Sequence, residues 1–236
     1  MGEGTGTAVI VGASSGIGEA LARRLAAAGW RLGLAARRLP KLETLASELG
    51  TGTVIRAIDV ASPEQARVEL ASLLEALGGA DLIVLSAGTG ELNPDLQWGP
   101  DRQTINVNVT GFAALAQFAI DHFLQRGRGH LVGISSVARF RGSGNAAAYS
   151  ASKAFVSTYL DGLRDKVRAS KLPITVTEAC PGFVDTAMMK ADKPFWVASP
   201  DRAAACIHSA IRRRAKHAFV TRRWALVGWA LRLLPA

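Results

Sequence analysis

The chain of 236 residues is long enough for one α/β domain or two small ones, and hydrophobic residues make up 49% of it, which allows a sizeable core. Aromatic residues are scarce at 6%, whereas alanine and glycine are plentiful, as expected where helices pack closely on a sheet. The sequence has no low-complexity run and no internal repeat, which excludes disordered and solenoid architectures.

The formal net charge of +9 comes from the end of the chain. Residues 202–236 contain eight Lys or Arg and no Asp or Glu, so residues 1–201 hold 20 basic and 19 acidic residues, a net charge of +1. The main body therefore needs no polyanionic partner. The arginines of the tail lack the interleaved aromatic residues of a recognisable nucleic-acid module, and we expect no nucleic-acid binding.

Neither a targeting segment nor a disulfide framework is predicted. The amino terminus runs directly into a strand-like segment, without the basic flank and long apolar region of a signal peptide. Acylation at Gly2 would require Ser or Thr at residue 6, which is Gly. Cys180 and Cys206 are expected to be reduced packing residues, and no zinc-ligand spacing is present, so we expect no metal. A cytoplasmic location is the default expectation.

In chain order, the first predicted elements are a strand over Thr7–Val11 and a helix that ends near Gly29, with a glycine-rich loop between them. Gly12, Gly16 and Gly18 have the spacing G-x-x-x-G-x-G. Without side chains, the backbone can turn tightly and approach a pyrophosphate, whose charge favours the helix amino terminus. The loop therefore favours dinucleotide binding, although glycine spacing alone is a weak signal.

Strands and helices then alternate along the chain. Strands are expected over residues 30–36, 53–58, 81–85, 130–135, 174–179 and 217–221, and helices over residues 39–49, 63–77, 101 onward, 149 onward and 201–214, with a loop at 93–100. This alternation is typical of a single doubly wound Rossmann-type α/β domain with a mainly parallel, seven-stranded sheet flanked by helices.

The stretch from Leu131 to Phe155 contains the residues best suited to catalysis. Tyr149 and Lys153 are four positions apart at the start of a predicted helix, so their side chains share one face. A neighbouring ammonium favours the phenolate and lowers the phenol pKa from its usual value of about 10. Tyr149 could then exchange a proton with a carbonyl or alcohol oxygen. Ser136 follows an apolar strand, at the end where open α/β sheets bind ligands.

The glycine-rich loop, Ser136, Tyr149 and Lys153, in this order, resemble the short-chain dehydrogenase/reductase family over nearly the whole chain. Tyr and Lys at this spacing are also common on ordinary amphipathic helices, so the order of the motifs matters. The resemblance implies reversible hydride transfer between a nicotinamide cofactor and a carbonyl or alcohol, in a homodimer or homotetramer. It implies that Tyr149 is the acid and base, that Lys153 tunes it and holds the nicotinamide ribose, and that Ser136 binds the substrate oxygen.

The same resemblance implies further roles. Asn108, three residues before Gly111, corresponds to an Asn inside a helix whose backbone distortion can hold a water near Lys153 and relay protons to Tyr149. Asn106 is a rival in register but lacks a glycine at that offset. The expected cofactor-binding residues are Gly12, Ser14, Ser15, Gly16, Ile17, Gly18, Arg37, Arg38, Asp59, Val60, Ser86, Ala87, Gly88, Tyr149, Lys153, Pro181, Gly182, Val184 and Thr186.

Some of these positions have competing interpretations or depart from the family pattern. Asp59 could line the adenine pocket or cap the helix that follows it. Pro181 and Gly182 match a pattern that holds the nicotinamide carboxamide, but Pro-Gly is also ordinary turn chemistry. Ser86 stands where the family usually has Asn, which changes the local hydrogen bonding without an evident loss of catalysis.

The cofactor form is predicted from the end of the second strand. NAD-preferring members of the family commonly have an acidic residue there, but this chain has Ala36, followed by Arg37 and Arg38. A guanidinium grips a phosphate through paired, charge-assisted hydrogen bonds. We therefore expect NADP(H) rather than NAD(H), with Arg37 as the main contact and Ser14 as an additional hydroxyl donor. The alternative is that both arginines only begin a solvated helix.

Two late segments bear on the substrate and on partners. Residues 187–199 form a short candidate lid whose methionines and aromatic residues, Met188, Met189, Phe195 and Trp196, suit a hydrophobic ketone or aldehyde, or are plain packing residues. Residues 222–236 are basic and apolar but too short to span a bilayer. This tail could pack on the body or a partner subunit, form a flap over the pocket, or lie on anionic lipid through Arg212, Arg213, Arg214, Lys216, Arg222 and Arg223.

These features predict an NADP(H)-dependent oxidoreductase that interconverts a carbonyl and an alcohol, on a hydrophobic substrate. Epimerases and dehydratases of related type also use Y-x-x-x-K, but they resemble longer chains with a larger substrate domain. A non-catalytic NADPH-sensing or scaffold protein is the alternative from a different class. It would retain the catalytic set only loosely, whereas Asn108, Ser136, Tyr149 and Lys153 are all present.

Overall fold

The computed structural model describes residues 6–50, 52–190, 194–221 and 223–233, and its centre is a seven-stranded sheet. The strand order is β3-β2-β1-β4-β5-β6-β7, and every neighbouring pair is parallel. The strands are β1 (Thr7–Val11), β2 (Arg31–Ala36), β3 (Val54–Ala57), β4 (Leu82–Leu85), β5 (Gly129–Ile134), β6 (Ile174–Pro181) and β7 (His217–Val220). The predicted doubly wound, Rossmann-type fold is confirmed, and the sheet is parallel throughout its length.

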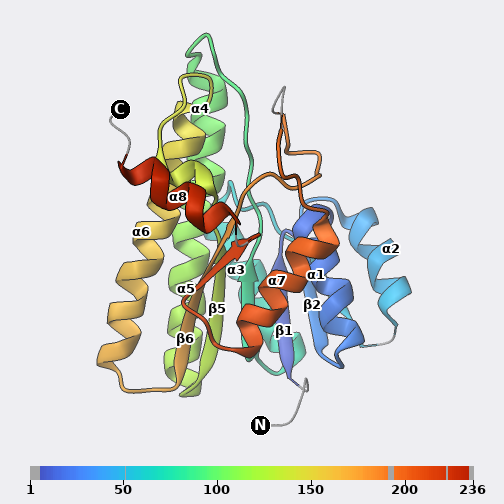
Figure 1. Ribbon diagram of the computed structural model, residues 1–236. Helices are drawn as coiled ribbons and strands as arrows, with labels where there is room; N and C mark the ends of the chain where they lie inside the picture. The colour runs from blue at the N-terminus through green and yellow to red at the C-terminus, as the bar shows by residue number, and fades with distance from the viewer. Residues whose placement is uncertain (1–5, 51, 191–193, 222, 234–236) are drawn as a thin grey trace.

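Helices cover both faces of this sheet (Figure 1). They are α1 (Gly16–Ala27), α2 (Leu39–Leu49), α3 (Pro63–Leu77), α4 (Trp98–Ile105), α5 (Phe112–Arg126), α6 (Ala147–Ala169), α7 (Pro200–Arg212) and α8 (Arg223–Leu233), with a π-helix η1 (Asn106–Gly111) and a 3-10 helix η2 (Val137–Phe140). The expected loop at 93–100 is shorter than predicted, because α4 already begins at Trp98. Pro100 lies in its first turn, where a missing backbone N–H costs no helical hydrogen bond.

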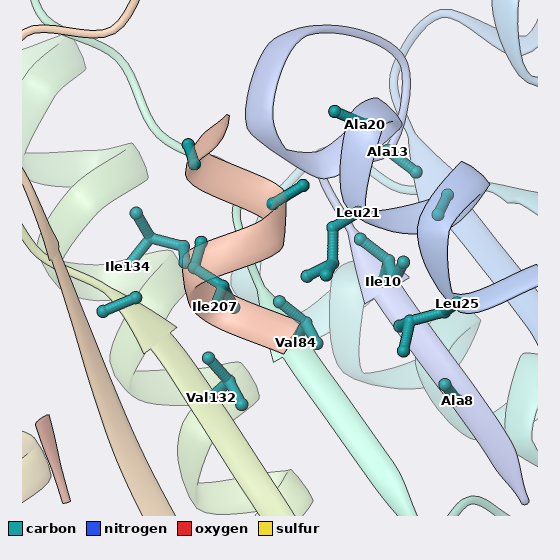
Figure 2. Packing of buried hydrophobic residues seen from close by; sticks show 14 of the residues in the cluster. Ala8, Ile10, Ala13, Ala20, Leu21, Leu25, Val84, Val132, Ile134 and Ile207 are labelled. Atoms are coloured by element: carbon teal, nitrogen blue, oxygen red, sulfur yellow. The ribbon is translucent and has the colours of Figure 1, made fainter. Parts of the chain in front are cut away.

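Successive side chains of β1 point to opposite faces of the sheet, and both faces are covered by hydrophobic clusters. Ala8 and Ile10 belong to the hydrophobic cluster under α1, α2 and α7, whereas Val9 and Val11 belong to the cluster under α3, α5 and α6. Figure 2 shows the first cluster, with Ile207 of α7 close to residues of β4 and β5. Strands buried on both faces read as continuous apolar runs, which is why the sequence pattern predicted them well.

The topology places all the predicted site loops at one edge. The chain winds from β1 through β2 to β3 on one side, and then returns to β4 and continues through β7 on the other. The order therefore reverses between β1 and β4, and open α/β sheets bind ligands outside the carboxyl ends of the strands at such a point. The loops that begin at Gly12, Ser86, Ser135 and Gly182 all leave this edge, the upper one in Figure 1.

Candidate functional site

The glycine-rich loop is defined by backbone contacts. Gly12 and Gly16 have φ angles of +94° and +59°, which side chains disfavour. A Cβ on Gly12 would overlap the backbone of Ala87, and one on Gly18 would overlap the carbonyl oxygen of Gly12. Ser15, the N-cap of α1, makes no side-chain capping hydrogen bond. The loop thus leaves the positive end of α1 open to an anion.

Arg38 lies against this loop. Its Nη2 donates to Ser14 Oγ over 2.9 Å and to Ser15 Oγ over 2.7 Å, and its Nε donates to Ser14 Oγ over 3.2 Å. Arg37, the residue expected to be the main phosphate contact, is exposed directly after β2. The Arg38 guanidinium therefore lies beside the amino terminus of α1, where it contacts both serines of the loop.

The turn after β3 closes the same region. Asp59 is exposed, and its Oδ1 accepts a hydrogen bond of 3.0 Å from the backbone N–H of Ala61, a local turn contact that precedes α3. Val60 is buried, and a Cβ on Gly111 would overlap its carbonyl oxygen. This contact closes a turn ahead of α3, whose N-cap is Ser62, so it is not a cap of the helix itself.

Ser136 and Lys153 both lie at the carboxyl end of β5. Ser136 is the N-cap of η2; its Oγ accepts a hydrogen bond of 3.2 Å from Ala138 N and donates one of 3.4 Å to the carbonyl oxygen of Pro181. Lys153 is 5% exposed, and its Nζ donates to the carbonyl oxygen of Ile134 over 3.1 Å. The Lys153 Nζ lies 5.7 Å from the centroid of the Tyr149 ring.

Burial controls the ionisation of both residues. Burial raises the pKa of Tyr149 above its ordinary value, although a hydrogen bond with Ser136 acts in the opposite direction. Burial also lowers the pKa of Lys153 to about 8. The lowered phenol pKa expected from the Tyr-Lys spacing is therefore not found, because the loss of solvent around the phenol outweighs the hydrogen bond from Ser136. Tyr149 accordingly keeps its proton at neutral pH.

Asn108 connects two of the loops. It is 1% exposed and lies in η1, so a π-helix occurs where the sequence indicated a distorted helix. Its Nδ2 donates to Thr89 O over 2.8 Å and to Ser152 Oγ over 3.0 Å, and its Oδ1 accepts from Thr89 N over 2.9 Å. Ser152 Oγ in turn donates to Tyr149 O over 2.7 Å. Asn108 thus joins the loop after β4 to the first turns of α6.

Gly88 lies at the centre of this group. A Cβ there would lie 3.3 Å from Asn108 Oδ1 and 3.4 Å from Lys153 Nζ. Ser86 and Ala87 continue β4 by donating their backbone N–H groups to Val11 O over 2.8 and 2.9 Å. The sequence analysis identified Gly88 but not Thr89 and Ser152. Threonine and serine are common at such positions, and their hydrogen bonds with Asn108 form only because the π-helix places that side chain between them.

The loop after β6 faces the glycine-rich loop. A Cβ on Gly16 would lie 3.0 Å from Thr186 Cγ2, and Thr186 Oγ1 donates to Val184 O over 3.4 Å. Val184 forms a parallel bridge with Ala198, which fixes the loop. Ile17 packs against the cluster under α1 and α7. Gly16 and Thr186, which are far apart in the sequence and were both predicted to bind the cofactor, thus lie next to each other.

Trp224 of α8 is a site neighbour that the sequence did not identify. It is 2% exposed, and its ring centroid lies 5.5 Å from that of Phe183, 5.1 Å from that of Phe195 and 5.9 Å from that of Trp196. A Cβ on Gly182 would overlap its indole. The described part of the tail therefore packs on the body, beside the candidate lid. Residues 191–193 of the lid, and Arg222 and residues 234–236 of the tail, lie outside the described residues.

The loop after β4 also approaches the candidate lid. Lys190 Nζ lies 2.6 Å from Glu91 Oε2. A Cβ on Gly90 would lie 3.2 Å from the Tyr149 ring and 3.3 Å from Met188 Cγ. The lid residues before the undescribed stretch therefore lie beside the phenol, which limits the space next to it.

Among the residues that the structure describes, none of the helices combines the length and the apolar character that a membrane span requires. The same residues include no group of three or more His, Cys, Asp or Glu side chains that could hold a metal ion.

The arrangement fits a nicotinamide dinucleotide on structural grounds. The glycine loop supplies a cradle that side chains would fill, and the uncapped start of α1 faces it. Gly88 and Lys153 continue this surface toward Tyr149, and Thr186 closes its far side. One edge of the sheet therefore brings groups suited to a phosphate-containing ligand next to the phenol of Tyr149 and the hydroxyl of Ser136.

Comparisons with known proteins agree with this geometry. Residues 6–195 match the model of the short chain dehydrogenase family. An uncharacterized oxidoreductase from Myxococcus xanthus is 42% identical over 183 residues, which cover 75% of this chain and 72% of the relative.

Solved structures are similar along nearly the whole chain. A short-chain dehydrogenase from Sphingobium yanoikuyae in complex with NADPH is 26% identical, with a TM-score of 0.80 and coverage of 95% of this chain and 92% of that one. A short chain dehydrogenase/reductase from Burkholderia phymatum in complex with NAD has a TM-score of 0.86 at 22% identity, covers 97% of this chain and 94% of that one, and supports the fold alone. The chain belongs to the short-chain dehydrogenase/reductase family of oxidoreductases.

Proposed function

We propose that this protein interconverts a carbonyl and an alcohol with NADP(H) as the hydride carrier, through Ser136, Tyr149, Lys153 and Asn108. The observation that carries the proposal is that Asn108 and Lys153 meet at Gly88, while the Tyr149 ring lies beside Gly90 and hydrogen-bonds with Ser136. Buried polar side chains are costly unless they are paired or functional, and here they gather at the ligand-binding edge of the fold.

Each residue has a distinct part in the reduction. When bound, the cofactor supplies the hydride. Ser136 Oγ holds the carbonyl oxygen and orients it toward Tyr149. Tyr149 donates its proton to that oxygen, which suits a phenol whose pKa is raised by burial. Lys153 is fixed by Ile134 O. The proton that Tyr149 gives up is replaced from bulk solvent, through a water that Asn108 holds near the Lys153 ammonium.

The reverse reaction requires the opposite protonation state. Alcohol oxidation needs Tyr149 as a phenolate that can accept the hydroxyl proton. Because burial raises the phenol pKa, this state is scarce at neutral pH. The protein in this arrangement is therefore better prepared for reduction than for oxidation.

The arginines after β2 support a preference for NADP(H). The Arg38 guanidinium contacts Ser14 and Ser15 at the start of α1, and Arg37 follows Ala36 without an acidic residue to repel a phosphate. A 2'-phosphate would take the place of the serine hydroxyls as the partner of the Arg38 guanidinium. Its contact would be stronger, because it is charge-assisted. Both arginines are proposed to hold it.

The wild-type protein tests the activity first. Loss of NADPH absorbance is followed against aldehydes and ketones graded from small polar to bulky hydrophobic, with NADH in parallel. We expect turnover with NADPH that favours the hydrophobic members, since Met188, Phe195 and Trp196 are exposed around the lid. Tight NADPH binding without turnover of any member would support a sensing or scaffold protein instead.

Charge reversal tests the cofactor form. Arg37→Asp and Arg38→Asp should each raise the KM for NADPH by roughly ten- to hundredfold while changing the KM for NADH little, because a charge-assisted phosphate contact contributes about 1.5–3 kcal/mol. Lys41→Asp, an exposed charge reversal in the first turn of α2, is the matched control. An unchanged KM for NADPH in both variants would disprove the assignment.

Oligomer formation is the last element of the proposal. Family resemblance supports a homodimer or homotetramer. Light scattering at several protein concentrations would measure the mass, and a monomer at all of them would contradict this part of the proposal alone.

A further inference from the structure

A buried carboxylate lies behind the Ser136 turn and has no part in the mechanism described above. Glu178 of β6 is 0% exposed, in a strand where both neighbouring residues are also buried. A carboxylate in such a place is strongly unfavourable unless it is paired and hydrogen-bonded. Its partners should therefore reveal why it is there.

Three side chains surround the Glu178 carboxylate. Ser135 Oγ donates to Oε1 over 2.5 Å, and Arg139 Nε lies 3.3 Å from the same oxygen. His217 of β7 lies with Nδ1 3.0 Å from Oε2. Burial opposes the charge, but the hydrogen bonds from His217 and Ser135 and the charge of Arg139 outweigh it and lower the pKa of Glu178. Glu178 is therefore ionised at neutral pH.

Two of these partners lie on either side of Ser136. Ser135 precedes it, and its backbone N–H also donates to Ala179 O over 2.8 Å. Arg139 follows three residues later, donates its backbone N–H to Ser136 O over 3.1 Å, and contacts Ser157 of α6 through its Nη1. One carboxylate thus holds both ends of the turn that carries the catalytic hydroxyl.

The orientation of the Ser136 side chain depends on this turn. The Oγ accepts from Ala138 N only while η2 keeps its conformation, and Ala138 directly precedes Arg139. If Glu178 lost its charge, Arg139 would lose its carboxylate partner at an 11% exposed position. The guanidinium would then be held by its contacts with Ser157 and the Phe140 ring, which would fix the end of η2 less firmly.

We propose that Glu178 is a positioning residue that fixes the Ser135–Arg139 turn and so aims Ser136 Oγ at the substrate oxygen. The inference rests on the proposed function of Ser136 but is separate from it, since Glu178 touches neither the cofactor loop nor the phenol in the contacts above.

Glu178→Gln tests this role because it keeps an acceptor for Ser135 and removes the charge that holds Arg139. We expect kcat for the carbonyl substrate reduced fastest to fall roughly ten- to hundredfold, as expected for a reacting group displaced by about 1 Å. The dissociation constant for NADPH should not change, because the glycine loop and its arginines are untouched. Glu64→Gln, in the exposed first turn of α3, is the matched control.

A double-variant cycle separates positioning from general damage. In a Ser136→Ala background, Glu178→Gln should cause no further loss of kcat, since the hydroxyl it positions is absent. The same loss in both backgrounds, or no loss in either, would overturn the inference. Ser135→Ala is the second probe if Glu178→Gln does not fold, and it should show the same dependence on Ser136.

The proposed function is judged by different results in the same experiment. Full activity of Ser136→Ala, or no reduction by the wild-type protein, would refute that function. Loss of activity in Ser136→Ala together with a normal Glu178→Gln would refute only the positioning role.

Discussion

The glycine-rich loop and the Ser136 turn lie on opposite sides of β4 and are built in contrasting ways. At Gly12 and Gly18 the shape depends on the absence of a Cβ, since any side chain would overlap neighbouring backbone. At Ser136 the shape depends on a buried ionised side chain, Glu178, and on its hydrogen bonds. The first design is steric and insensitive to pH, whereas the second is electrostatic and depends on the ionisation of Glu178.

The largest expected effect is a loss of kcat from a change beside the Ser136 turn that leaves the glycine-rich loop intact. Tyr149→Phe removes the proton donor, and we expect kcat to fall by about a thousandfold, in the range that general acids contribute. The dissociation constant for NADPH, measured by fluorescence quenching, should stay within about twofold because no phosphate contact changes. Comparable loss from Tyr159→Phe, a tyrosine that packs on Phe155 and Phe112, would contradict a specific role for Tyr149.

Gly18→Ala is the reciprocal change. Its Cβ would overlap the Gly12 carbonyl oxygen, so the loop must move and the amino terminus of α1 loses its fit to a pyrophosphate. We expect NADPH affinity to fall by roughly tenfold or more, equivalent to about 1.4 kcal/mol. Isothermal titration gives the value. Gly162→Ala, at a helical position with open space for a Cβ, is the control and should bind normally.

The pH dependence of the two directions should differ because burial raises the Tyr149 pKa. Reduction needs the phenol and should keep its rate through neutral pH, then decline as the pH rises through the raised pKa. Oxidation needs the phenolate and should increase over the same range. Profiles of kcat in both directions measure this. A reduction rate that falls already near neutral pH would contradict a protonated Tyr149.

The last effect concerns stability away from the site. His130 Nε2 lies 2.8 Å from Thr177 Oγ1, whose proton goes to Ala215 O, so the imidazole is the donor. Burial lowers the pKa of His130 from 6.5 to about 4. Between these two pH values the unfolded chain binds a proton at His130 that the folded protein does not bind. The stabilisation from neutral His130 is therefore fully present above the pKa of the unfolded chain, and it is lost as the pH falls toward the pKa of the folded protein.

The size of the pKa shift sets the loss in the free energy of unfolding, which is on the order of 3 kcal/mol once the pH is below both pKa values. His130→Gln can still donate to Thr177 but does not titrate. Urea unfolding at about pH 7 and about pH 5 should show a smaller loss for the variant than for the wild-type protein. Equal losses would show that His130 does not carry the pH dependence.

The contrast between the two regions also explains what the sequence could reveal. Apolar runs buried on both faces and the glycine spacing follow from local geometry, so the parallel sheet and the loop after β1 could be predicted. The direction of the Tyr149 pKa shift could not be predicted, because it is set mainly by burial, which depends on the whole fold. Glu178 and Trp224 are distant in sequence from the groups they support, and only the sheet order and the path of α8 bring them together.

The most direct test of the central claim measures NADPH consumption and alcohol formation together, for wild-type protein and Tyr149→Phe. We predict one alcohol formed per NADPH consumed in the wild-type protein. With the same concentration of Tyr149→Phe saturated with NADPH, we expect neither NADPH consumption nor alcohol formation to be detectable. NADPH consumption without alcohol, or equal rates in both proteins, would contradict a carbonyl reduction centred on Tyr149.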